Sequence, residues 1–333
     1  MIKFKKSAYR SIILISIFLF IVIIFLIINP NKYINSAFNG ILIWAKAVLP
    51  ALFPFFFLTK LLTELGAVKL LANSMHKFMN KLFHINGLGS YVFLTSIMSG
   101  YPVGAKITSE LYEKQLIDSS QAQRLVTFTS TSGPLFVIGT VGVGMFASPK
   151  LGFIVLISHF LGAFLNGILY RNHNYDKTKN IHSEKFTISK IDENILEKSM
   201  LSAINSVLIV GGFISVFFIF IDIFTDIGLI GAFSYTLGQI LYLFGLNENY
   251  AFSIVTGFLE MTRGCYELSL SFTDLNIATV FISFIISFGG LSTHLQAMTF
   301  LQKCNIKMSF FLKQKFTHAI FASLIAYFMC IIL

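Results

Sequence analysis

Charged residues are scarce in this sequence. Only 12% of its 333 residues are Asp, Glu, Lys or Arg, whereas 55% are hydrophobic. Soluble domains carry about 25% charged residues, so this composition excludes a water-soluble globule. We expect an all-α integral membrane protein, because helices satisfy their own backbone hydrogen bonds in lipid.

The sequence has only three cysteines and lacks the common motifs of enzymes. Cys265, Cys304 and Cys330 form no C-x-x-C pair, which argues against a disulfide framework and against a zinc site. His159 and His294 have no second ligand at metal spacing, and the chain has no phosphate loop, nucleophile elbow or zincin motif. We therefore expect no enzymatic activity, no catalytic residue, no metal and no cofactor.

Negative charge is scarcer than positive charge, and the net charge is +10 at pH 7. The Lys and Arg residues lie mostly in short loops between apolar stretches and form no single basic stripe, so a nucleic-acid partner is not expected. Cytoplasmic loops of membrane proteins are enriched in Lys and Arg. This bias predicts a cytoplasmic N-terminus, with Lys315 counted among the cytoplasmic cations.

Apolar stretches near the length of about 20 residues that crosses a bilayer core recur along the chain. We expect about seven transmembrane helices, at 11–29, 36–62, 124–147, 150–170, 199–223, 276–301 and 311–333. All of them belong to one membrane domain, 1–333.

The two halves of the chain resemble each other at an offset of about 157 residues. Gly100 aligns with Gly257, Lys106 with Arg263, and Gly133 with Gly289. Each half contains a crossing, an amphipathic stretch, a glycine-broken hairpin and a glycine-broken crossing. Since one crossing joins the halves, we predict an inverted repeat with two re-entrant helical hairpins.

The predicted segments follow from this repeat. They are an N-terminal anchor helix (1–33), repeat unit 1 (34–147), a connecting helix with a cytoplasmic linker (148–198), repeat unit 2 (199–301) and a C-terminal helix (302–333).

Broken helices at membrane depth indicate a cavity, because irregular backbone is tolerated there only against protein or water. A helix that restarts after a break directs free N–H groups and its positive dipole end into the cavity, which suits an anion. The candidate solute-binding residues near the breaks are Gly100, Tyr101, Lys106, Ser132, Gly133, Glu260, Arg263, Gly289, Gly290, Ser292, His294 and Gln296.

Lys106 and Arg263 are candidate solute contacts because ionisable groups inside membrane segments usually face a polar path or a partner. Two cations beside one cavity would favour a dianion. The alternatives are that either side chain reaches an interface, or that Arg263 pairs with Glu260 or Glu267. Glu260 is also a candidate for coupling to a proton or cation.

Five motifs lie at the breaks and in the crossing before them. They are Leu49–Phe56 (LPALFPFF), Ser99–Lys106 (SGYPVGAK), Ser132–Gly144 (SGPLFVIGTVGVG), Leu259–Cys265 (LEMTRGC) and Phe288–Gln296 (FGGLSTHLQ). With these motifs the chain resembles, from about residue 35 to 325, the sporulation integral membrane protein YlbJ family, also called stage V sporulation protein V. That family is part of the wider nucleoside-recognition or Gate-type membrane domains.

The resemblance implies a transporter in the cell membrane that moves dipicolinic acid from the mother cell across the outer forespore membrane during sporulation. Its flat dicarboxylate fits two cations, two half-helix N-termini and aromatic neighbours such as Tyr101. The implied partners are this solute, the lipid bilayer, and a second copy or other sporulation membrane proteins. The alternatives are a nucleoside or ion permease of the Gate type and a sporulation scaffold that transports nothing.

Overall fold

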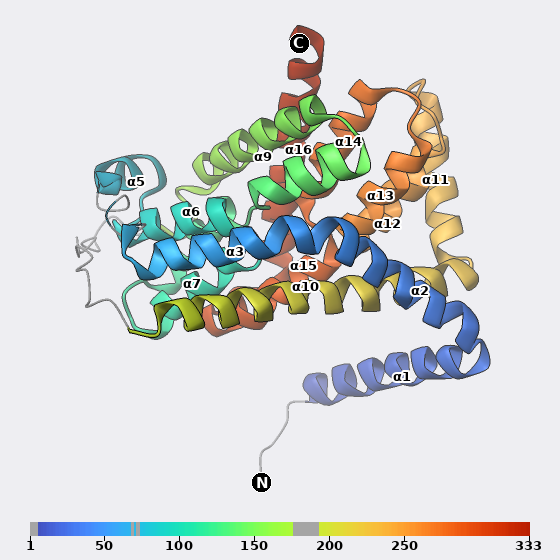
Figure 1. The fold of residues 1–333 in the computed structure, drawn as a ribbon, viewed down its shortest axis with the longest axis horizontal. Coiled ribbons are helices and arrows are strands. Elements are labelled where there is room, and N and C mark those ends of the chain that lie inside the picture. Colours follow the sequence, from blue (N-terminus) through green and yellow to red (C-terminus); the bar gives the residue numbers. More distant parts are fainter. Residues whose placement is uncertain (1–5, 68–69, 71–73, 176–192) are drawn as a thin grey trace.

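The computed structural model describes residues 6–67, 70, 74–175 and 193–333, and the described part is helical throughout (Figure 1). Five helices are long and apolar enough to cross a membrane: Pro30–Glu64, Pro149–Tyr170, Ile195–Asp226, Leu275–Cys304 and Met308–Ile332. They confirm five of the predicted crossings, and the chain is an all-α membrane protein. Residues 176–192 of the predicted linker lie outside the described residues.

The first long helix and its counterpart in the second half run side by side. The first consists of α2 (Pro30–Ile43), a π-helical segment η1 (Trp44–Val48) and α3 (Leu49–Glu64). It contacts α10 (Ile195–Asp226), which opens the second half. The N-terminal helix α1 (Lys6–Ile28) lies at the edge of the molecule and exposes most of its apolar side chains. Such exposure suits a lipid-facing helix.

In each half the long helix is followed by a single shorter helix and then by a helical hairpin. In the first half α5 (His76–Phe83) precedes α6 (Leu88–Ser99) and α7 (Val103–Glu113). In the second half α11 (Leu229–Leu243) precedes α12 (Tyr250–Leu259) and α13 (Met261–Ser271). Both hairpins are found where the repeat predicts them, and their re-entrant insertion into the membrane stays a prediction.

A broken crossing and a long helix complete each half. The first half has α8 (Ser119–Thr129), an irregular stretch, the π-helical η2 (Phe136–Met145) and then α9 (Pro149–Tyr170). The second has α14 (Leu275–Phe288), α15 (Gly290–Leu301), the short 3-10 turn η3 (Gln302–Cys304) and α16 (Met308–Ile332). The two halves therefore repeat the same order of elements.

The sequence predicts α9 as a connecting helix and α16 as a C-terminal helix, but in the structure both also pack against the broken crossings. They contact each other, and both contact α8 and α14, the first parts of the two broken crossings. Each therefore holds a matching place at the end of its half.

One predicted break is displaced. Gly257 lies inside α12, and the chain breaks three residues later at Glu260, whose backbone is extended. Gly257 instead provides room for close packing. A side chain there would contact Ile285 of α14, and its backbone touches the place where a side chain on Gly264 would lie. The glycine that the repeat aligns with Gly100 therefore serves close packing, and Glu260 marks the break.

Candidate functional site

Each hairpin break contacts the crossing break of its own half through glycine. Gly100 has φ +71°, and a Cβ atom there would lie 2.5 Å from the backbone nitrogen of Gly133. In the second half Gly290 has φ +70°, and its Cβ would lie 3.0 Å from the Gly257 carbonyl oxygen and from the Met261 nitrogen. A side chain fits at neither position, so these glycines allow four interrupted backbones to meet.

A buried cavity of about 40 Å³ lies where the breaks meet. Both halves supply its walls, with the hairpin tips, the crossing breaks, α3 and α10. The lining residues are Leu52, Phe56, Ser99, Gly100, Tyr101, Ser132, Gly133, Phe136, Val210, Ile214, Glu260, Met261, Thr262, Ser292, Thr293 and Gln296. We call this space the central cavity. It is large enough for water but closed to a larger solute in this conformation.

Most of the predicted site residues meet at the central cavity. Those in its lining are Gly100, Tyr101, Ser132, Gly133, Glu260, Ser292 and Gln296. Gly289 lies next to it, since a Cβ there would be 3.2 Å from the Tyr101 hydroxyl oxygen. His294 is fully buried and donates from Nε2 to the Phe288 carbonyl over 2.7 Å.

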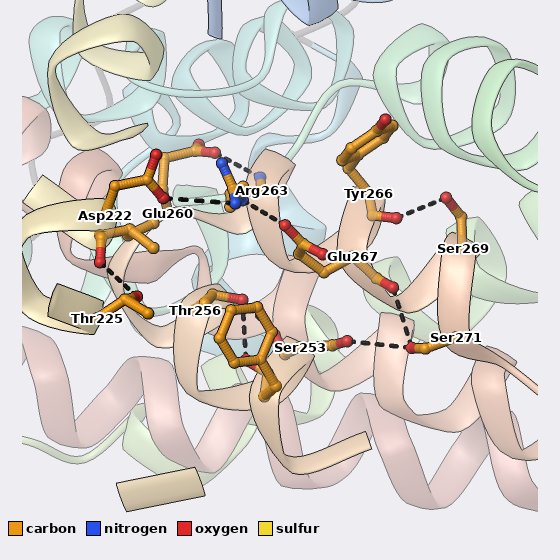
Figure 2. Close-up of polar contacts among 12 residues, drawn as sticks. Asp222, Thr225, Ser253, Thr256, Glu260, Arg263, Tyr266, Glu267, Ser269 and Ser271 are labelled. Atoms are coloured by element: carbon orange, nitrogen blue, oxygen red, sulfur yellow. Dashed lines mark hydrogen bonds and ion pairs between the residues drawn. The ribbon is translucent and has the colours of Figure 1, made fainter. Parts of the chain in front are cut away.

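The two predicted cations do not share this cavity. Lys106 is exposed and is absent from the lining. Arg263 points away from it: Nε lies 2.6 Å from Glu267 Oε1, Nη2 lies 3.5 Å from Asp222 Oδ1, and the guanidinium sits 4.6 Å from the centre of the Phe218 ring (Figure 2). The expected cation pair at one site is therefore wrong, and the internal pairing of Arg263 with Glu267 is confirmed.

Arg263 lines a second, larger space of about 480 Å³, which we call the vestibule. Its walls come from α2, η1, η2, α10 and α13, and its charged residues are Lys46, Arg263 and Glu267. Small-molecule sites typically enclose about 300–1,000 Å³, so the vestibule is of a size that admits a solute. Helix α13 lines both spaces, the vestibule with Arg263 and Glu267 and the central cavity with Met261 and Thr262.

Glu260 lines the central cavity and caps the N-terminus of α13. Its buried carboxylate accepts a hydrogen bond from the Arg263 backbone N–H over 2.6 Å (Figure 2). A negative group at a helix N-terminus interacts favourably with the dipole. The N-terminus of α13 is thus occupied by the chain itself, whereas α7 and α15 have no side-chain cap.

A buried cation lies behind the central cavity, and it is not at the cytoplasmic surface where the charge bias predicts it. Lys315 of α16 has no exposed surface. Its ammonium donates to the Tyr101 hydroxyl, to the Ser130 carbonyl over 2.7 Å and to His318 Nδ1 over 3.1 Å. A lysine and a histidine three residues apart inside an apolar helix were the signal for this cluster.

His159 of α9 connects both crossing breaks. Its Nε2 accepts a hydrogen bond from the Ser132 N–H over 2.8 Å, which leaves Nδ1 to donate to Ser287 Oγ over 2.8 Å. Its backbone carbonyl accepts from His318 Nε2 over 2.9 Å. Hydrogen bonds from α9 to both crossing breaks, and from α16 to α9, therefore hold the breaks in place.

Comparisons with known proteins give a family model and a sequence relative. Residues 45–164 match the family model Gate, described as nucleoside recognition. The chain is 27% identical over 335 residues to the "Sporulation integral membrane protein YlbJ" of Bacillus subtilis (strain 168), across 95% of this chain and 82% of that protein. No solved structure matches.

The Gate match begins in η1 and ends in α9, so it contains the first hairpin and the first broken crossing. The match to YlbJ extends over both halves. The resemblance indicated by the motifs is thus confirmed: the chain is an integral membrane protein that is similar to YlbJ, and residues 45–164 match the Gate model.

Proposed function

We propose that this protein transports a small anionic solute, and that the solute is dipicolinate, moved from the mother cell across the outer forespore membrane during sporulation. The sporulation context follows from the name of the YlbJ relative. The solute follows from the family resemblance. The single observation that carries transport is the central cavity, where four breaks from both halves meet in a buried space.

Interrupted helices favour transport over a passive structural role. Unpaired backbone groups in hydrocarbon cost several kcal/mol each, so breaks persist only where a polar path or protein compensates them. Transporters with repeated halves bind solutes between discontinuous helices near the bilayer midplane. The central cavity likewise lies between discontinuous helices, and both crossing breaks contribute polar groups to it, Ser132 and Ser292 among them.

Two helix N-termini beside the cavity favour an anion, and the carboxylate of Glu260 in the lining is already bound to the N-terminus of α13. The N-termini of α7 and α15 lack side-chain caps and lie at breaks beside the cavity. Free N–H groups and the helix dipole both attract negative charge there. The central cavity of about 40 Å³ has room for water, and the vestibule of about 480 Å³ has room for a small solute.

Flux into liposomes tests the proposal. Purified protein is reconstituted into liposomes that contain terbium, whose luminescence reports dipicolinate that has crossed. We expect uptake with the protein and none in protein-free liposomes. Absence of uptake by folded, correctly inserted protein would rule out dipicolinate transport.

A matched pair of threonines locates the path. Thr293 lines the central cavity, whereas Thr236 is exposed on α11; each hydroxyl donates to a carbonyl of its own helix. We expect Thr293→Val to lower flux roughly fivefold, the effect of about one hydrogen bond of 1 kcal/mol, and Thr236→Val to leave it unchanged. Equal flux in both variants would show that the solute does not pass through the central cavity.

A nucleoside permease is the second candidate, because the Gate model is described as nucleoside recognition. The same liposomes, supplied with labelled uridine in place of dipicolinate, separate the two. Uridine uptake without dipicolinate uptake would favour this candidate, and uptake of neither by folded protein would favour a scaffold.

Orientation is part of the proposal, with the N-terminus in the cytoplasm. We expect a cysteine placed at Lys32 to react with a membrane-impermeant reagent from outside, and cysteines at Ser183 or Asn305 to be shielded. Labelling of the latter two from outside would reverse the orientation.

A further inference from the structure

In the described part of the chain, Lys315 differs from the cations that form salt bridges, because no acidic side chain pairs with it. Lys32 pairs with Asp226, Lys60 with Glu64 and Lys303 with Glu113. Arg263 has two acidic partners. Lys315 is fully buried, and its hydrogen-bond partners are a hydroxyl, a carbonyl and an imidazole.

Among the described residues, the ionisable side chains around Lys315 are Tyr101 from the first hairpin, His159 from α9, His294 from α15 and His318 from its own helix. None of them carries a carboxylate. A buried ammonium without a counter-charge is costly, and in membrane proteins such groups mark solute or ion pathways. The described surroundings of Lys315 thus contain no anion, and an anionic ligand would compensate its charge.

Tyr101 stands between Lys315 and the central cavity. Its side chain lines the cavity and its hydroxyl accepts a hydrogen bond from Lys315, whereas Lys315 is absent from the lining. The ammonium lies 4.9 Å from the centre of the Tyr101 ring, within the range of a cation–π contact. The ring thus covers the ammonium on the side of the cavity.

Ser130 supplies a second, independent sign of a missing partner. Its carbonyl holds Lys315, but its buried hydroxyl has no hydrogen-bond partner among the described residues. Buried hydroxyls are normally satisfied, and an exception calls for a ligand or water. A carboxylate next to Lys315 is a suitable acceptor for this hydroxyl.

We propose that Lys315 is an anion-binding residue covered by Tyr101, and that a carboxylate of the solute takes the place of the Tyr101 hydroxyl on the ammonium when the Tyr101 ring moves aside. The inference rests on the proposed function, because it names the residue that recognises the anionic solute. It assigns to α16 the positive charge that Lys106 and Arg263 do not supply to the cavity.

Equilibrium binding in detergent tests this without reference to transport. The two probes are dipicolinate and its neutral diamide, which has the same ring and shape without the charges. We expect wild-type protein to prefer dipicolinate. We expect Lys315→Met to weaken dipicolinate binding roughly 10- to 100-fold, the contribution of a charge-assisted hydrogen bond, and to leave binding of the diamide unchanged. A control variant at an exposed cation, Lys303→Met, should bind both probes as wild type does.

Tyr101→Phe provides a second test that keeps the ring and the lysine. Because the hydroxyl competes with the carboxylate for the ammonium, we expect this variant to bind dipicolinate as tightly as wild type or more tightly. Weaker binding would overturn the proposal, and this test holds even if Lys315→Met does not fold.

The outcomes separate the two proposals. If wild-type protein binds dipicolinate and Lys315→Met binds it equally well, Lys315 has only a structural role and the present inference fails alone. If folded wild-type protein binds no dipicolinate, the proposed solute is wrong and the inference fails with it.

Discussion

The two hairpin breaks have the same place in the repeat but opposite electrostatic character. In the second half Glu260 caps α13 with its own carboxylate, and the nearby Arg263 is neutralised by Glu267 and Asp222. In the first half α7 has no side-chain cap, and the adjacent Tyr101 is bonded to the unneutralised Lys315.

This difference assigns separate tasks to the halves. The charged groups of the second break, Glu260 and Arg263, have partners within the chain, so this break requires no external ligand. The first break leaves a helix N-terminus and a cation without a negative partner among the described residues. Repetition of a fold therefore does not imply repetition of its chemistry.

Packing at the hairpins is what the halves share, and here we expect the largest effect. A Cβ on Gly264 would collide with the Gly257 backbone, and one on Gly104 with the Thr129 carbonyl. We expect Gly264→Ala and Gly104→Ala each to lose about 1–3 kcal/mol of stability through overpacking. Melting temperatures in detergent measure this.

Gly231 provides the matched control for both variants. It lies in α11, and a Cβ there meets nothing within 4 Å. Gly231→Ala should gain about 0.5–1 kcal/mol from the lower entropy of the unfolded chain. If only one of the two hairpin variants is destabilised, the two hairpins are not packed alike, and the packing similarity between the halves is wrong.

Capping distinguishes the halves, with a smaller expected effect. Glu260→Ala removes the acceptor for the Arg263 N–H and should cost about 1 kcal/mol, the usual value of an N-cap. Glu260→Gln keeps an acceptor oxygen and should cost less. Thermal unfolding of the purified variants measures both. An alanine variant as stable as wild type would show that the second break does not depend on its own carboxylate.

The base of the first hairpin predicts the smallest effect, a dependence on pH. His84 lies between α5 and α6, and burial lowers its pKa, with the Arg171 guanidinium lowering it further. The unfolded chain takes up a proton near pH 6.5 whereas the folded chain does not, so this stability is complete above about pH 6.5 and falls as the pH falls below it. The equivalent loop of the second half, 244–249, has no histidine.

We expect the melting temperature to fall between about pH 7.5 and 5.5 and the fall to be smaller in His84→Gln. The difference between the two pH profiles isolates His84 from the other titrating groups. An identical profile in the variant would show that His84 contributes nothing to the acid sensitivity.

Glycine made much of the site predictable from the sequence. Gly100, Gly133 and Gly289 interrupt apolar stretches, and the structure places all three at breaks beside the central cavity. The i,i+4 pairing of Arg263 with Glu267 was also visible, because residues at that spacing share a helix face. Local spacing was sufficient for both.

Long-range contacts were not predictable in the same way. Asp222 pairs with Arg263 from a different helix, and no sequence spacing reports this. Lys315 was counted with the loop cations because it follows Lys303, Lys307 and Lys313 near a helix end. Its burial depends on how α16 packs against α9 and α14, which composition does not reveal.

The ring of Tyr101 has a consequence for the energy of the transport cycle. On the proposal above, the Lys315 ammonium faces an aromatic ring when the site is empty and a carboxylate when it is filled. An uncompensated charge inside a membrane segment is costly. The ring offsets only part of that cost in the empty carrier, whereas the carboxylate neutralises the charge in the loaded one. We therefore expect the loaded carrier to change conformation more readily than the empty one.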